Sequence, residues 1–154
     1  MLSILNLAKT LFFVAAGAVA VYSASADSCI SATNSSQEQI LMNKISIHTS
    51  NGFDCKIELA NTKAAQALVT KLPLKLTLED FGDTERIAYL KSKLEVDDGA
   101  YPPKAGDVAY YVPWGNLAFF RKDFRTSQHL LFIGKIDPTC IKALESTDSI
   151  VISK

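Results

Sequence analysis

The chain has 154 residues, of which 48% are hydrophobic, and its 16 Lys and Arg balance its 16 Asp and Glu to a formal net charge of +0. These values are ordinary for a single globular domain. Because no basic block, acidic tail or Arg-rich patch interrupts that balance, the sequence lacks the electrostatic footprint of a protein that binds nucleic acid or a membrane surface.

The first 26 residues have the pattern of a cleavable secretory signal. They carry one basic residue, Lys9, and no acid, and an apolar run at 11–21 is followed by the small residues of 24–26. The run is too short to span a bilayer comfortably. We therefore predict cleavage after Ala26 and a secreted or periplasmic protein with no stable membrane span. The alternative is an uncleaved membrane anchor.

Residues 27–39 are rich in Ser, Asn and Thr and poor in apolar side chains. This composition predicts a flexible leader, which leaves residues 40–154 as the folded domain. Asn34 begins an Asn-Ser-Ser acceptor pattern for N-glycosylation, which matters only in a eukaryotic cell.

Three cysteines, Cys29, Cys55 and Cys140, would remain after cleavage, and an odd count leaves at least one unpaired. Cys55 is in phase with the apolar residues of its strand, so we expect it to point into the core. A bridge from Cys29 to Cys140 or to Cys55 is one interpretation, and buried or idle thiols are the other. The sequence contains no CxxC motif and no His/Cys cluster at ligand spacing, so we predict no metal site and no cofactor.

Alternating apolar residues predict a β-hairpin over residues 45–59, with its turn at Asn51-Gly52, where both positions tolerate positive φ. Residues 61–71 supply an N-cap, good helix formers and an apolar stripe, which together predict a short helix. Pro73 prevents that helix from running further. Residues 74–78 alternate again and predict a strand, whereas the charged segment 80–96 favours neither type of structure.

The densest pattern lies in residues 105–134, where aromatic and β-branched residues predict two strands around a Pro-Trp-Gly-Asn turn. A nearly continuous apolar run at 130–136 predicts a strand covered on both faces. Asp137-Pro138 begins a short helix through residue 145, and residues 150–152 form a last strand. Many strands and two short helices indicate a mainly β fold, a closed or nearly closed β-barrel that the helices plug or flank.

Six segments then follow one another in a recognisable order: residues 68–74, 75–79, 82–86, 106–111, 117–120 and 131–136. In this order they resemble the bacterial-type cyclophilin-like domain proteins, a group of small domains of uncharacterised function. The likeness extends over about residues 44–153. It implies a cyclophilin-like closed β-barrel with two short helices, and the family's name describes a fold rather than an activity.

True cyclophilins are prolyl isomerases. Their active site resembles a hydrophobic groove for proline, with an Arg from a Phe-His-Arg segment and a Phe-Met-x-Gln-Gly-Gly-Asp segment beside it. This sequence contains neither segment, and Phe120-Arg121 is the nearest counterpart, late in the chain and without the Gln and paired glycines. Because a fold does not carry a function by itself, isomerisation is an alternative and not the leading hypothesis.

The candidate ligand-binding residues are Glu85, Tyr111, Trp114, Phe120, Arg121 and His129. The three rings offer broad contact area with few polar groups, although such rings also fill cores. Glu85 could act as an acid, a base or an acceptor, or pair with Arg86 at the surface. Arg121 and Arg125 could bind a carboxylate or phosphate, or lie on a solvated hairpin end. His129 could shuttle protons, or be hydrogen-bonded at a strand edge.

The sequence thus favours an exported cyclophilin-like domain that binds a small ligand or a peptide in a groove beside the barrel, without a complete catalytic motif. Peptidyl-prolyl cis-trans isomerisation through Arg121 or Arg125 is the first alternative. The second is a cell-envelope interaction protein that exposes a strand edge near Pro113.

Overall fold

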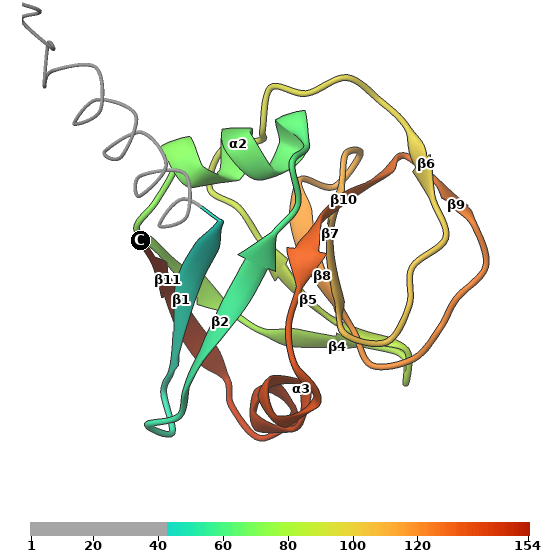
Figure 1. Cartoon of the computed structure of the whole chain (residues 1–154). Coiled ribbons are helices and arrows are strands. Elements are labelled where there is room, and N and C mark those ends of the chain that lie inside the picture. The colour runs from blue at the N-terminus through green and yellow to red at the C-terminus, as the bar shows by residue number, and fades with distance from the viewer. Residues whose placement is uncertain (1–42) are drawn as a thin grey trace, which may run out of the picture.

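The computed structural model describes residues 43–154, so the predicted signal sequence and leader lie outside the described residues. The strands are β1 (Lys44–Thr49), β2 (Asp54–Leu59), β3 (Leu74–Thr77), β4 (Glu79–Phe81), β5 (Glu85–Tyr89), β6 (Ala100–Tyr101), β7 (Asp107–Tyr111), β8 (Asn116–Phe120), β9 (Ser127–Gln128), β10 (Leu130–Lys135) and β11 (Ser149–Ser153). The helices are α2 (Lys63–Thr70) and α3 (Pro138–Glu145) (Figure 1). The expectation of a mainly β fold with two short helices is confirmed.

Local signals determine the predicted hairpin and both helices. In the turn between β1 and β2, Gly52 adopts the positive φ of 84° that the Asn-Gly pair anticipates. The Thr62 hydroxyl caps α2 by accepting from the Ala65 amide at 3.1 Å. The Asp137 carboxylate caps α3 by accepting from the Cys140 amide at 3.0 Å. Within the described residues, neither helix is long and apolar enough to cross a membrane.

Nine strands form one antiparallel sheet, in the order β3-β11-β1-β2-β10-β7-β8-β5-β4, and β6 pairs with β9 separately. The sheet is not closed into a barrel by hydrogen bonds, so the expectation of a closed β-barrel is corrected. Its two edge strands, β3 and β4, are successive pieces of chain separated by Leu78 alone. A strand cannot pair with its own continuation. The chain instead crosses from β11 to β5, and the Leu78 amide donates to the Asp148 carbonyl at 2.8 Å.

Arg86 of β5 lies buried at this opening of the sheet, with 6% of its surface exposed. Its Nη1 donates to the carbonyls of Leu144 at 2.5 Å and Thr147 at 2.7 Å, and its Nη2 donates to the Leu78 carbonyl at 3.1 Å. One side chain thereby joins the link between the edge strands, the last turn of α3 and the segment before β11. The Leu144 carbonyl belongs to a helix end, where intrahelical donors run out.

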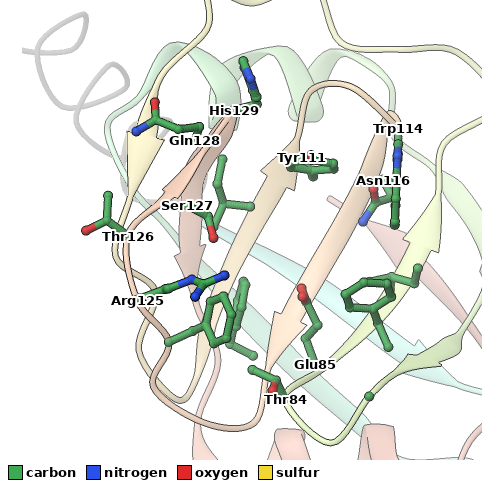
Figure 2. A pocket seen from close by; sticks show the side chains of 16 residues that line it. Thr84, Glu85, Tyr111, Trp114, Asn116, Arg125, Thr126, Ser127, Gln128 and His129 are labelled. Atoms are coloured by element: carbon green, nitrogen blue, oxygen red, sulfur yellow. The ribbon is translucent and has the colours of Figure 1, made fainter.

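The strands β5, β8, β7 and β10 are covered on both faces. Their inward side chains, which include Val108 and Tyr110, belong to the main core. Their outward side chains form a second cluster of Ile87, Ala109, Ala118, Phe120 and Leu130, against which Tyr101 and Tyr111 pack. The prediction that Tyr110 and Tyr111 point to opposite faces of the strand is confirmed, since Tyr110 lies in the main core and Tyr111 packs on the outer cluster. The outer face carries the pocket of Figure 2.

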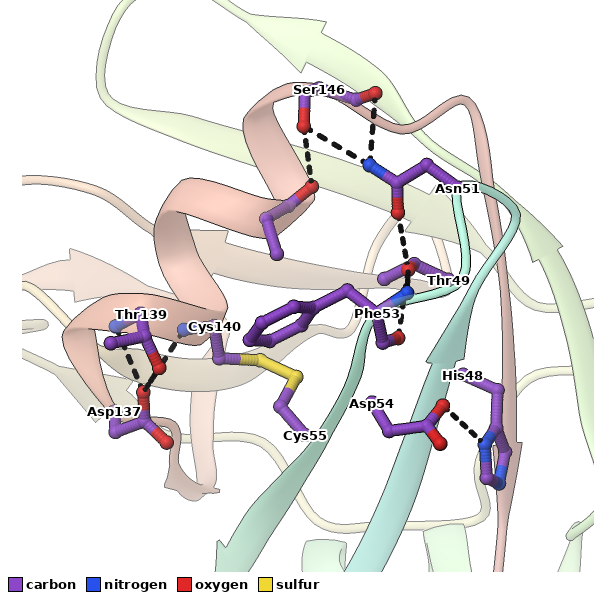
Figure 3. Close-up of a disulfide and its surroundings, with 11 residues drawn as sticks. His48, Thr49, Asn51, Phe53, Asp54, Cys55, Asp137, Thr139, Cys140 and Ser146 are labelled. Carbon is purple, nitrogen blue, oxygen red and sulfur yellow. Dashed lines mark hydrogen bonds and ion pairs between the residues drawn. A yellow bond between two sulfur atoms is a disulfide. The ribbon is translucent and has the colours of Figure 1, made fainter.

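A disulfide joins Cys55 of β2 to Cys140 of α3, whose Cα atoms are 5.7 Å apart (Figure 3). The suggested bridges from Cys29 are therefore wrong, since both candidate partners are bonded to each other. Cys55 does point into the core, with 8% exposed. Near the other end of α3, the Asn51 amide donates to the Ser146 hydroxyl at 3.1 Å. The helix is thus attached to the hairpin both near its start and at its end.

We expect Arg86→Met to lower the free energy of unfolding by about 3 kcal/mol, because three buried carbonyls lose their donor. Urea denaturation of the two proteins measures the difference. Arg125→Met is the control, since Arg125 is exposed. Equal midpoints for Arg86→Met and the natural protein would show that the contacts of Arg86 with these carbonyls do not stabilise the fold.

We expect the double variant Cys55→Ala/Cys140→Ala to lose about 2–4 kcal/mol of stability, because the bridge spans 85 residues and restricts the unfolded chain. Reductant should lower the denaturation midpoint of the natural protein and leave that of the variant unchanged. Cys29→Ala keeps the bridge and serves as the control. A loss of stability in Cys29→Ala that matches the double variant would contradict the observed pairing.

Candidate functional site

A pocket of about 740 Å³ lies on the outer face of β5, β7 and β8 (Figure 2). Three parts of the chain surround it: the β4–β5 hairpin, the β7–β8 hairpin and the segment that leads through β9 into β10. The residues that line it are Phe81, Gly82, Thr84, Glu85, Ile87, Tyr111, Trp114, Asn116, Phe120, Phe124, Arg125, Thr126, Ser127, Gln128, His129 and Leu130. Five of the six predicted site residues are in this set.

Strand register brings the predicted residues together. Glu85 of β5 is paired with Phe120 of β8, and Asn116 at the other end of β8 is paired with Tyr111 of β7. Tyr111 is in turn paired with Leu130 of β10. Paired residues of neighbouring strands point to the same face, so these five side chains share the outer surface.

Trp114 lies in the turn between β7 and β8 and is 48% exposed. The centroid of its ring lies 5.6 Å from that of Phe81 and 5.4 Å from that of Tyr111, and both contacts are edge-to-face. Edge-to-face contacts of this kind add to the stability that burial alone provides. The three rings therefore form one wall of the pocket, which connects the β4–β5 and β7–β8 hairpins.

Glu85 is partly buried beside this wall. Burial raises the pKa of its carboxyl from 4.5 to about 7, and the nearby Arg121 guanidinium only partly offsets that effect. Glu85 does not form the surface pair with Arg86 that the sequence allows, because Arg86 points to the opposite face of the strand. A carboxyl with such a pKa can accept or donate a proton near neutral pH.

Arg121 is the predicted site residue that does not line the pocket. Its Nη1 lies 3.0 Å from Asp80 Oδ1, and its Nη2 donates to the backbone carbonyls of Gly82 at 3.0 Å and Glu85 at 3.1 Å. These contacts hold the β4–β5 hairpin against the end of β8. The guanidinium therefore affects the pocket indirectly, by holding this hairpin in place and by partly offsetting the rise in the pKa of Glu85.

His129 stands at the junction of β9 and β10 with a positive φ of 62°. Its Nδ1 lies 2.5 Å from Asp98 Oδ2, and its carbonyl accepts from the Val112 amide at 2.9 Å. A hydrogen bond from the Gly99 amide and then the contact with His129 lower the pKa of Asp98. The imidazole is thus oriented by a carboxylate while it lines the pocket.

Asn116 and Phe81 are among the pocket residues that sequence reasoning missed. Asn116 is 2% exposed, its Nδ2 donates to the Leu117 carbonyl at 3.2 Å, and its Oδ1 has no partner. An orphaned acceptor of this kind is rare in a folded protein and needs an explanation. The Pro-Trp-Gly-Asn turn marked Asn116 only as a turn residue, and Phe81 lay in the segment without a predicted structure.

Two further observations concern the rest of residues 43–154. A second pocket of about 660 Å³ lies over β1 and β2, lined by side chains of both charges that include Lys44, Glu58 and Lys135. None of the six predicted site residues lies there. In the described part of the chain, no three His, Cys, Asp or Glu side chains are grouped closely enough to hold a metal ion.

Comparisons with known proteins agree with this fold. The hypothetical protein AF2241 from Archaeoglobus fulgidus has a solution structure that matches with a TM-score of 0.56 and 22% identity, over 71% of this chain and 92% of that chain. At that identity the likeness concerns the fold alone. A search of curated proteins finds no significant match. A model of the cyclophilin-like family matches residues 48–153, which is more than half of the chain, and the protein therefore belongs to the cyclophilin-like family.

Proposed function

We propose that this cyclophilin-like protein is exported and binds a small organic ligand or a peptide in the outer-face pocket. The observation that carries the proposal is the convergence of Glu85, Tyr111, Trp114, Phe120 and His129, from separate parts of the chain, on one pocket with the unpartnered Oδ1 of Asn116.

The size and lining of the pocket support this function. A volume of about 740 Å³ is within the range of small-molecule sites. Such sites combine aromatic walls with a few polar groups that fix the orientation of the ligand. Here Phe81, Tyr111 and Trp114 supply the wall, and Glu85 and Asn116 supply the polar groups.

Two features support export. Residues 1–26 have the charge and apolar pattern of a secretory signal. The bridge between Cys55 and Cys140 suits an oxidising compartment, where disulfides form and persist.

Prolyl isomerisation is the second candidate, and one contact bears on it. Arg121 is bound to Asp80 and to two carbonyls, so an isomerase mechanism would have to use Arg125, which lines the pocket with Phe120. An isomerisation assay on a proline-containing peptide tests it, with acceleration lost in Arg125→Gln as the supporting result.

The alternative of a cell-envelope interaction protein assumed an exposed strand edge near Pro113. That assumption loses its basis, because Pro113 lies in a turn and the edges of the nine-stranded sheet are β3 and β4.

Trp114 is the only tryptophan of the sequence and lines the pocket, so its fluorescence reports on occupancy. We expect a screen of aromatic metabolites and short peptides to contain compounds that shift its emission saturably. Tyr111→Ala should weaken such binding about tenfold, because it removes a ring that contacts Trp114. Lys56→Ala, on β2 away from this pocket, is the control. A complete screen without a saturable shift would refute the proposed function.

The raised pKa of Glu85 also predicts how stability depends on pH. Between pH 4.5 and about 7 the folded state keeps a proton that the unfolded state has lost, so the free energy of unfolding falls as pH rises. Glu85→Gln should remove this loss. Its free energy of unfolding should therefore exceed that of the natural protein by about 1–2 kcal/mol near pH 8 and should equal it near pH 4. Urea denaturation at both pH values measures the difference. The exposed Glu79→Gln is the control, and an equal gain there would contradict the assignment.

A further inference from the structure

Two opposite charges face each other across the outer-face pocket. Glu85 enters it from β5, and Arg125 extends toward it from the segment before β9 (Figure 2). Asn116 lines the same pocket farther along β8, at the opposite end of that strand from Phe120, the partner of Glu85.

Within residues 43–154, neither Glu85 nor Arg125 has an ion-pair or hydrogen-bond partner for its side chain. Burial raises the pKa of Glu85, and no hydrogen bond to the carboxylate lowers it. The Arg125 guanidinium lies over the Phe124 ring, 5.4 Å from its centroid. The two charged groups are thus left open toward the same space.

The charged side chains around them behave differently. Arg121 is 3.0 Å from Asp80, Lys122 is 2.5 Å from Asp83, and Lys104 is 3.2 Å from Asp123. Each of these charges is matched by a partner on a neighbouring segment. Glu85 and Arg125, which both line the pocket, are the exceptions among them.

A ligand could complete both groups at once. Its cationic N–H group would be accepted by the Glu85 carboxylate, which lines the pocket. Its carboxylate would accept the forked hydrogen bonds that the Arg125 guanidinium offers. A flat apolar body between the two ends would contact Tyr111 and Phe120, which line the same space.

We propose that the pocket selects a small zwitterion, with an ammonium group at one end, a carboxylate at the other and a flat apolar body between them. This inference rests on the proposed function and names the class of ligand. It requires no chemical step, because binding alone satisfies the charges.

A matched series of compounds tests the proposal. Para-aminomethylbenzoate carries both charges on one ring, benzylamine carries only the cation, benzoate only the anion, and benzyl alcohol neither. Para-(2-aminoethyl)benzoate adds a zwitterion with its charges farther apart. Affinities are measured by calorimetry and by Trp114 fluorescence near pH 8, above the pKa of about 7 to which burial raises Glu85.

We expect at least one zwitterion to bind about tenfold or more tightly than each singly charged and neutral analogue. Glu85→Gln should weaken the binding of the zwitterion and of benzylamine about tenfold and leave the affinity for benzoate unchanged. Arg125→Gln should weaken the binding of the zwitterion and of benzoate and leave the affinity for benzylamine unchanged. The matched controls, Glu79→Gln and Lys122→Gln, alter an exposed acid and an exposed base that do not line the pocket and should have no effect.

Two outcomes would overturn the inference. The first is a neutral or singly charged analogue that binds as tightly as both zwitterions. In that case the pocket remains a ligand site, and only the class of ligand is wrong. The second is that no member of the series binds. The broader screen with Trp114 then decides the proposed function separately, since it contains compounds outside this class.

Discussion

The buried guanidinium of Arg86 is the contact on which the architecture depends. The two edge strands of the sheet are consecutive pieces of the chain, so backbone hydrogen bonds cannot join them. The chain joins them through Leu78, and Arg86 fixes this link by donating to the carbonyls of Leu78, Leu144 and Thr147. A buried charge destabilises a fold unless polar groups surround it, and here a helix end and a strand link accept from both terminal nitrogens, while Nε lies 3.5 Å from Asp80 Oδ1. These contacts therefore supply acceptors to a buried guanidinium and donors to three buried carbonyls.

Strand β5 connects this interior contact to the pocket. Successive residues of a strand point to opposite faces, so Arg86 points inward while Glu85 and Ile87 point outward. The pairing of Glu85 with Phe120 then places the carboxyl beside the aromatic surface, where burial raises its pKa. A register shift of one residue would exchange the two faces and bury the wrong charge. Stability and the chemistry of the pocket thus depend on one register.

Local patterns predicted much of the fold, and long-range contacts account for what they missed. The Asn-Gly turn, the helix caps and the alternation around Tyr110 and Tyr111 depend on neighbouring residues, and the structure agrees with each. β5 was hidden because Arg86, a charged side chain, occupies an inward position. Arg121 and Cys140 were misplaced because their partners, Asp80 and Cys55, are distant in sequence and spacing cannot reveal them. The unpaired state of Asn116 also becomes visible only in three dimensions.

The segment 124–129 closes one side of the pocket, and exposed side-chain contacts fasten its two ends. Before it, Asp123 accepts from the Ala105 amide and contacts Lys104, and at its end His129 contacts Asp98. Between them, the β6–β9 ladder and the bond from the Phe124 amide to the Pro103 carbonyl fix its course. Dissolved salt screens exposed charges but leaves backbone hydrogen bonds nearly unchanged. Ionic strength therefore weakens the contact between Lys104 and Asp123 at the start of this wall, while the backbone hydrogen bonds along its middle keep their strength.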